Sequence, residues 1–141
     1  MIIKFKIDQN AKAPTKAHFM DAGFDLYAPN DYFRVILPHE SAAIDTGTAI
    51  CIPDGYCGLL VSKSGLNVKH GIKSTGLVDA GYTGNIVVKL YNDSDSPFIL
   101  EGGMKISQIV ILPIPDVMLE QVKDFGVETE RGTNGFGSSG K

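Results

Sequence analysis

Apolar and polar residues alternate along much of the chain, which is the pattern of half-buried β-strands. Ile3, Phe5 and Ile7 alternate with lysines, and the segment Ile86–Tyr91 alternates in the same way. Further candidate strands, all short and rich in apolar residues, are Phe24–Ala28, Val35–Leu37, Ala42–Asp45, Ala49–Ile52, Tyr56–Val61, Ile72–Val78, Phe98–Leu100, Ile106–Leu112 and Val117–Val122.

Turn-forming residues separate these candidate strands, at Pro29–Asp31, Pro38–Glu40, Pro53–Gly55, Asn92–Asp95 and Glu101–Gly103. About ten short strands at intervals of about 8–12 residues are typical of a β-sandwich or barrel. Only Ser64–Lys69 could form a helix, of one or two turns. We therefore predict an all-β, jelly-roll-like sandwich or barrel over residues 1–127, with one short helix.

The composition is that of a globular domain. With 141 residues, of which 43% are hydrophobic, the chain can form one core. The net charge of −3 and the lack of a basic run argue against a nucleic-acid polymer as partner. No apolar stretch approaches a membrane span, and the charged N-terminus lacks a signal-peptide profile.

The cysteines and histidines indicate no metal site or disulfide. Cys51 and Cys57 lack histidines at matching spacing, so we expect two reduced thiols and a cytoplasmic protein. His18, His39 and His70 are scattered along the chain and are interpreted as surface or structural residues.

The last residues, 131–141, are rich in glycine and serine and bury too little apolar surface to fold alone. They nevertheless contain Phe136 and Arg131, one of only two arginines in the chain. A guanidinium suits phosphate oxygens, an aromatic ring suits a base, and glycine-flanked amides can wrap an anion. We expect residues 128–141 to be a flexible arm that closes over an active site, with an inert solvated terminus as the alternative.

Polar residues gather in five blocks between the candidate strands, which are Ala22–Ala28, Ser62–Leu66, Gly76–Ile86, Gly102–Gln108 and the glycine-rich tail. In order and spacing, from about residue 22 to residue 140, these blocks resemble the five motifs of the trimeric deoxyuridine triphosphatases (dUTPases). One such block alone would be weak evidence, whereas five in order are strong. The resemblance implies hydrolysis of dUTP to dUMP and pyrophosphate, by attack of water on the α-phosphorus.

The resemblance assigns the nucleoside and the attacking water to the block Gly76–Ile86. Asp79 would orient and deprotonate the water, and Tyr82 would stack on the deoxyribose and exclude a 2′-hydroxyl. Backbone groups along Lys73–Gly76 would read the acceptors and the donor of uracil. Some family members have an asparagine where Lys73 stands, so this chain is expected to use backbone alone. Taken singly, Asp79 could stabilise its own turn and Tyr82 could pack across strands.

The resemblance assigns the phosphates to Lys63, Ser64, Gly65, Lys105 and Gln108. Gln108 would also contact the attacking water and so be the second catalytic residue beside Asp79. Free amides at the start of a helix at Ser64 favour anions. Lys63 stands where the family usually has arginine, and lysine keeps the charge but lacks the bidentate fork. Asp25 would support the site and hold a water of the shell of Mg²⁺, the implied cofactor. Taken singly, Asp25 and Gln108 could be ordinary polar residues of a strand surface.

Within the tail, the resemblance places Arg131 on the γ-phosphate and Phe136 over the uracil. It places further donors on the β- and γ-phosphates, from Gly137, Ser138 and Ser139. In this family the tail closes over the site of a neighbouring subunit, and each site is built from three chains. The resemblance therefore implies a homotrimer with shared sites.

Three other functions fit parts of the pattern. A dCTP deaminase shares the fold but needs a glutamate at the amino group, and every glutamate lies outside the Asp79 block. A dUTPase-fold protein could act as a nucleotide-gated binder of a regulatory partner, as suspected of some phage-encoded relatives, although no insertion is evident between Asn85 and Gly102. A capsid or carbohydrate-binding sandwich would make the five motifs a coincidence.

Overall fold

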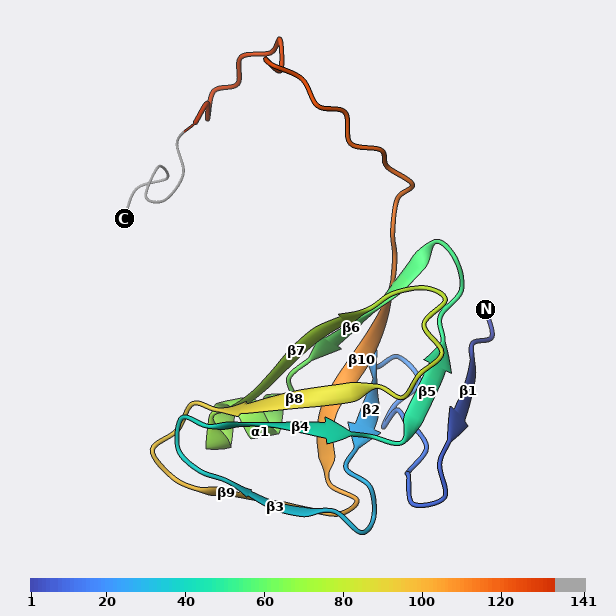
Figure 1. Ribbon diagram of the computed structural model, residues 1–141, viewed down its shortest axis with the longest axis vertical. Coiled ribbons are helices and arrows are strands. Elements are labelled where there is room, and N and C mark those ends of the chain that lie inside the picture. Colours follow the sequence, from blue (N-terminus) through green and yellow to red (C-terminus); the bar gives the residue numbers. More distant parts are fainter. Residues whose placement is uncertain (134–141) are drawn as a thin grey trace.

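The structure is a computed structural model in which residues 1–133 are described. Within them lie ten strands and one helix (Figure 1). The elements are β1 Lys4–Ile7, β2 Gly23–Tyr27, β3 Phe33–Ile36, β4 Ser41–Asp45, β5 Thr48–Cys51, β6 Tyr56–Val61, α1 Ser64–His70, β7 Ile72–Val78, β8 Val87–Asn92, β9 Phe98–Glu101 and β10 Lys105–Pro113. The prediction of an all-β domain with one short helix is confirmed.

One large sheet carries most of the core. Its strand order is β2-β10-β6-β7-β8-β4, and β1–β5 and β3–β9 form two-stranded sheets beside it. The large sheet curls, with β3–β9 at one end and β1–β5 along one side (Figure 1). Side chains inside the curl are fully buried and include Leu26, Ile44, Val88, Leu90 and Ile109. They alternate with exposed residues, as expected when one face of an antiparallel sheet meets the core.

The helix α1 follows β6 closely and ends at a glycine. Gly71 has a φ of 66°, a left-handed conformation that glycine adopts without strain, and its N–H donates to the carbonyls of Asn67 and Leu66. The short helix predicted from Ser64 is therefore confirmed. In the part of the chain that the structure describes, no helix is long and apolar enough to cross a membrane.

The alternation in the first strand predicts a half-buried element, and this prediction is wrong. The strand β1 forms, but all four of its residues are exposed, Phe5 at 53% and Ile7 at 44%. β1 pairs with β5, and within residues 1–133 no second strand covers its outer edge. Its apolar residues therefore stay at the surface of the single chain.

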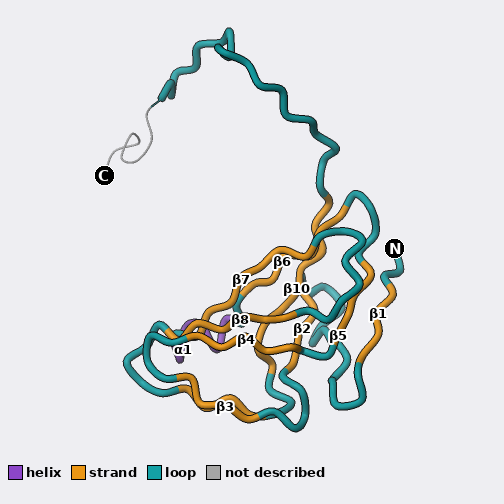
Figure 2. Tube along the Cα trace, in the orientation of Figure 1, coloured by secondary structure: helices purple, strands orange, loops and turns teal. Residues whose placement is uncertain are grey.

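The predicted strand Val117–Val122 is also wrong, because these residues have no regular structure. They belong to an arm that leaves the body of the molecule after β10 (Figure 2). Met118 is 95% exposed and Leu119 is 100% exposed. A strand requires a hydrogen-bonded partner, and no described strand lies beside this arm.

Candidate functional site

Three charged residues from three different elements meet at one carboxylate. Nζ of Lys63 lies 2.5 Å from Oδ1 of Asp25, and Nζ of Lys105 lies 2.7 Å from Oδ2. We call these three residues the cation–carboxylate cluster. The Asp25 side chain is only 6% exposed, whereas the Lys63 and Lys105 side chains are 25% and 45% exposed. The cluster carries one net positive charge and presents its lysines to solvent, so it can attract an anion.

A β-bulge brings Lys105 and Gln108 to the same face of the sheet. Lys105 is paired with Tyr27 and Gln108 with Asp25, and the register of β10 on β2 shifts between Lys105 and Ser107. In a regular strand, residues three apart point to opposite faces. The extra residue of the bulge changes the alternation by one, so the side chains of Lys105 and Gln108 both lie on the face of Asp25. Bulges near active sites often redirect side chains in this way.

The ion pairs govern the titration of the cluster. Burial alone would raise the pKa of Asp25, but the hydrogen bonds and charges of Lys105 and Lys63 outweigh it, and its pKa is lowered from 3.8. The hydrogen bond and charge of Asp25 raise the pKa of Lys105. At neutral pH Asp25 and Lys105 are therefore both in their charged forms.

The start of α1 and the side chain of Gln108 border the cluster. Lys63 is the N-cap residue of α1 and has an extended backbone, so Ser64 and Gly65 follow as the first helical residues. Nε2 of Gln108 donates to the carbonyl of Ser62 at 3.3 Å, which holds the amide next to Lys63. The predicted phosphate residues Lys63, Ser64, Gly65, Lys105 and Gln108 thus lie at one end of β6 and β10.

Asp79 lies in a tight turn directly after β7. The N–H of Tyr82 donates to the carbonyl of Asp79 at 3.4 Å, and Gly81 between them has a φ of 78°. The second residue, Ala80, does not have a positive φ, so the positive φ at the third residue fits a type II turn and explains the glycine there. Gly81 also donates its N–H to the carbonyl of Ile52. The turn is fixed to the body, and the Asp79 side chain is exposed.

Tyr82 folds back over the same hairpin. Its hydroxyl donates to the carbonyl of Asn85 at 2.9 Å, and 48% of the residue is exposed. A Cβ at Gly84 would lie 2.5 Å from the tyrosine oxygen, so only glycine leaves room for the ring in this position. The hydroxyl end of the ring is thereby held in place while the residue remains accessible.

A hollow of about 300 Å³ opens between β7 and β8 beside this turn. Its lining residues include Gly76, Asp79, Tyr82, Asn85 and Lys89. β7 pairs with β8 at Ile72, Lys73 and Ser74, and in the described structure the two strands separate after that point. The edge of β7 beyond Ser74 therefore offers backbone donors and acceptors to a ligand in the hollow.

The chain does not bring all predicted site residues together. Val61 is paired with both Gln108 and Thr75, so these three residues lie in one row across the sheet. Asp79 comes four residues after Thr75, about 13 Å further along the strand direction at the usual rise. The predicted phosphate residues and the Asp79 hollow are thus separate regions of one chain.

The described residues do not form a protein-ligated magnesium site. In residues 1–133 there is no group of three histidine, cysteine, aspartate or glutamate residues that could hold a metal. Both oxygens of Asp25 accept hydrogen bonds from lysines, whose charges would repel a bare cation. Any Mg²⁺ at this site would need most of its ligands from the nucleotide and water, which is common for this ion.

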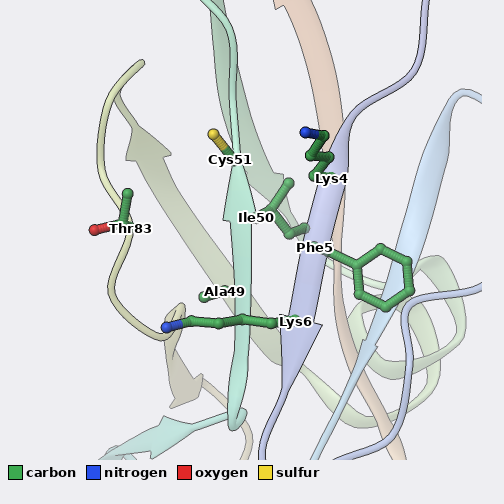
Figure 3. A pocket seen from close by; sticks show the side chains of 7 residues that line it. All are labelled: Lys4, Phe5, Lys6, Ala49, Ile50, Cys51 and Thr83. Carbon is green, nitrogen blue, oxygen red and sulfur yellow. The ribbon is translucent and has the colours of Figure 1, made fainter.

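A second hollow, of about 290 Å³, lies over the β1–β5 ladder beside the loop that carries Thr83 (Figure 3). It is lined by Lys4, Phe5, Lys6, Ala49, Ile50, Cys51 and Thr83, none of which was predicted as a site residue.

Cys51 and Cys57 are both free thiols. His18, His39 and His70 are exposed, as predicted.

The structure describes only one of the site residues predicted in the tail. Arg131 is described and lies in an exposed turn near the end of the arm. Phe136, Gly137, Ser138 and Ser139 lie outside the described residues. The sequence interpretation missed three hydrogen-bonded serines beside the predicted phosphate residues, which are Ser62, Ser74 and Ser107. Serine is frequent in strands and turns alike, so no pattern distinguishes them, although Ser62 and Ser107 each precede a predicted phosphate residue.

Known proteins resemble this chain over nearly its whole length. The dUTPase family model matches residues 9–140. A deoxyuridine 5′-triphosphate nucleotidohydrolase of Clostridium tetani is 41% identical, covering 99% of this chain and 97% of the relative. One of Wolbachia pipientis is 38% identical, covering 99% and 94%.

Solved structures agree with these sequence relatives. The Staphylococcus bacteriophage 80alpha dUTPase with dUpNHpp superimposes with a TM-score of 0.91 at 35% identity, covering 99% of both chains. A variant dUTPase from phage phi11 of S. aureus, described as coordinating a structural Mg(II) ion, has a TM-score of 0.81 at 30% identity, covering 90% of this chain and 100% of that one. The predicted resemblance is confirmed, and the chain belongs to the dUTPase family.

Proposed function

We propose that this chain hydrolyses dUTP to dUMP and pyrophosphate, with Asp79 as the general base for water that attacks the α-phosphorus. Family membership supports the activity. The observation that carries the assignment of the base is an exposed carboxylate, fixed by a type II turn, at the rim of a hollow with a free strand edge. A carboxylate held on a rigid element can orient a water and accept its proton.

The hollow between β7 and β8 is the proposed nucleoside site. Uracil presents two carbonyl acceptors and one N–H donor, which the edge of β7 from Thr75 to Val78, including Gly76, can match. A cytosine there would leave buried polar groups unpaired, which is costly. Tyr82, held over Gly84, would lie flat against the deoxyribose and leave no room for a 2′-hydroxyl.

The cation–carboxylate cluster is the proposed phosphate site. Lys63 and Lys105 would neutralise phosphate oxygens, and Asp25 holds both ammonium groups in place. The amides of Ser64 and Gly65 and the side chain of Gln108 would add hydrogen bonds where charge develops at the α-phosphate. Asp25 would reach Mg²⁺ only through water. Mg²⁺, when carried by the triphosphate, supplies charge neutralisation on the phosphate oxygens.

We further propose a homotrimer in which neighbouring chains complete each other's sites. The separation of Asp79 from Gln108 supports this, because one nucleotide must reach both regions. The exposed apolar arm supports it too, since Val117, Met118, Leu119 and Phe125 are each at least 70% exposed in the single chain. Residues 128–141, the last part of this arm, would then close over a neighbour's site, with Arg131 on the γ-phosphate.

A nucleotide panel tests the activity directly. With Mg²⁺, dUTP should be converted to dUMP and pyrophosphate, while dCTP, dTTP and UTP should react more slowly by orders of magnitude. In ¹⁸O-labelled water the label should enter dUMP, because the attack is on the α-phosphorus. Equal turnover of dUTP and dTTP would contradict the uracil site, and label in pyrophosphate would contradict the point of attack.

Subunit complementation tests the shared sites. Asp79→Asn and Gln108→Ala, each nearly inactive alone, should recover activity when the two chains are unfolded and refolded together. With random mixing, about a quarter of the sites in a cyclic trimer would pair an intact Asp79 with an intact Gln108. A mixture of the Asp79→Asn/Gln108→Ala double variant with Asp79→Asn is the control, because no such pairing arises there. No recovery in the first mixture would show that each chain builds its own site.

A regulatory role is the second candidate. The 80alpha relative is described among phage dUTPases that control transfer of virulence genes by a proto-oncogenic G protein-like mechanism. If this chain also binds a regulatory protein, dUpNHpp should change the affinity for that partner. A dCTP deaminase is disfavoured because, among residues 1–133, Asp79 is the one acid that lines the hollow. Release of ammonia from dCTP would reverse that judgement.

A further inference from the structure

Three serines form one hydrogen-bonded group beside the proposed phosphate site. The hydroxyl of Ser62 accepts the N–H of Ser74 at 2.9 Å and donates to the Ser74 carbonyl at 3.1 Å. The hydroxyls of Ser74 and Ser107 are 2.8 Å apart, and Ser107 donates to the carbonyl of Val61 at 3.0 Å. The group therefore joins β6, β7 and β10 through side chains.

Ser62 replaces a rung of the β6–β7 ladder with its side chain. The register of this pair ends at Val61 and Thr75, so Ser62 and Ser74 would be the next partners. Instead, the Ser62 hydroxyl serves both backbone groups of Ser74. The backbone of Ser62 is thus released from the ladder, and its carbonyl accepts the amide of Gln108.

Ser107 directly follows the bulge that sets the face of Gln108. Ser107 is completely buried and Ser74 is 6% exposed. The direction of the hydrogen bonds is determined, because Ser107 donates to Val61 and must therefore accept from Ser74. Two residues of the serine group also directly precede phosphate residues, Ser62 before Lys63 and Ser107 before Gln108.

We infer that Ser62, Ser74 and Ser107 are positioning residues that fix the ammonium of Lys63 and the amide of Gln108 for the triphosphate. This inference rests on the proposed function. The serines do not touch the substrate; they act by holding the ends of β6 and β10 where the next residue must contact phosphate. A displacement of about 1 Å in such a group can lower a rate about 10²-fold.

A double-mutant comparison separates positioning from stability. Ser107→Ala leaves the buried Ser74 hydroxyl without its acceptor, so it should lower both the melting temperature and kcat. Ser74→Ala/Ser107→Ala removes both hydroxyls and leaves no unpaired donor, so the melting temperature should recover at least in part. If the pair positions Gln108, kcat of the double variant stays about 10- to 100-fold below the parent. Recovery of kcat together with stability would overturn the inference.

Ligand binding locates the defect of Ser62→Ala. This variant should bind dUpNHpp about 10-fold or more weakly while binding deoxyuridine like the parent, because only the phosphate contacts are displaced. Ser62→Thr keeps the hydroxyl and should restore triphosphate binding. Ser94→Ala is the matched control, since Ser94 donates a hydroxyl hydrogen bond to Asn92 in the β8–β9 loop. Equal losses for dUpNHpp and deoxyuridine would show a general structural defect instead.

A titration independent of catalysis distinguishes the two hypotheses. If the parent does not hydrolyse dUTP, the proposed function fails, but the positions of the lysines are still measurable. The ¹³C NMR signal of the Asp25 carboxyl should titrate at higher pH in Ser62→Ala than in the parent, because Lys63 is no longer held at Oδ1. An unchanged midpoint would overturn the inference for Lys63 whatever the activity.

Discussion

Gln108 lies directly opposite Asp25 on the β10–β2 ladder, although Asp25 forms its ion pairs with Lys63 and Lys105. The bulge before Ser107 makes this arrangement possible by bringing Lys105 and Gln108 to one face. Two cations, one carboxylate and one amide are thereby gathered at the end of three strands. The consequences can be tested residue by residue.

Asp79→Asn should lower kcat for dUTP by about 10²–10⁴-fold, the usual effect of losing a general base. Asparagine keeps the size of the side chain and the backbone turn with Tyr82, so dUpNHpp should bind almost as tightly as to the parent. Steady-state kinetics and calorimetry measure the two quantities. Asp54→Asn, an exposed aspartate in the β5–β6 turn, is the control. A nearly unchanged kcat in Asp79→Asn would make Asp79 a turn residue only.

Lys63→Ala should lower kcat/KM for dUTP by about 10- to 100-fold, which is the loss expected when a hydrogen bond to a charged group is removed. Lys63→Arg keeps the charge and can form a bidentate contact, so its activity should equal or exceed that of the parent. Lys123→Ala, on the exposed arm, is the control for loss of a lysine charge. Parental kinetics in both Lys63 variants would exclude Lys63 from the phosphate site.

The ion pairs of Asp25 should affect how the free energy of unfolding depends on pH at acidic pH. The lowered pKa of Asp25 means that its stabilising contribution is present above the ordinary value of 3.8 and is lost as the pH falls through the folded-state value. The free energy of unfolding should therefore fall more steeply in the parent than in Asp25→Asn below that pH. Denaturant titrations between about pH 2 and pH 6 measure this difference. Parallel profiles would show that Asp25 titrates alike in both states.

Removal of Mg²⁺ should stop turnover without affecting the fold. EDTA should abolish most dUTP hydrolysis, and added Mg²⁺ should restore it. The melting temperature of the nucleotide-free protein should not change, because residues 1–133 contain no cluster of three metal-binding side chains. Full activity in EDTA would exclude a magnesium requirement. A large fall in melting temperature would indicate a structural metal.

Truncation after Glu130 should preserve the β domain and deoxyuridine binding but remove most of kcat, because Arg131 and the following donors would be lost. Truncation after Ser139 removes only Gly140 and Lys141 and should leave kcat unchanged. The chain has no tryptophan, so Phe136→Trp provides a single reporter of stacking on uracil. Its emission should change with dUpNHpp and not with dTTP. Full activity after removal of residues 131–141 would show an inert terminus.

The sequence was sufficient to predict most strands because each alternating run has its own partner within the chain. It failed for the burial of Phe5 and for a strand at Leu119, because within residues 1–133 no surface covers either residue. Alternation predicts that one face of a strand is apolar and tends to be buried. It does not show whether the same chain or another chain buries that face.

Some features of the candidate site could likewise be predicted from the sequence, and others could not. Asp79 and Lys63 stand in recognisable motifs, and the structure places both at accessible ends of strands. The bulge before Ser107 and the rung replaced by Ser62 could not be predicted, because both depend on register between strands that are distant in sequence. The separation of Asp79 from Gln108 likewise becomes visible only when the strands are in order.

The space that Gly84 leaves for Tyr82 has a consequence for the descent of this chain. Position 84 can acquire a side chain only if the ring at position 82 turns away or is lost, since a Cβ would lie 2.5 Å from its oxygen. On the proposed role of Tyr82, such drift would release the restriction on the sugar before it disturbed the core. In a lineage that replaced Gly84, the first detectable change would therefore be hydrolysis of ribonucleotides, while the fold and the selectivity for uracil remained intact.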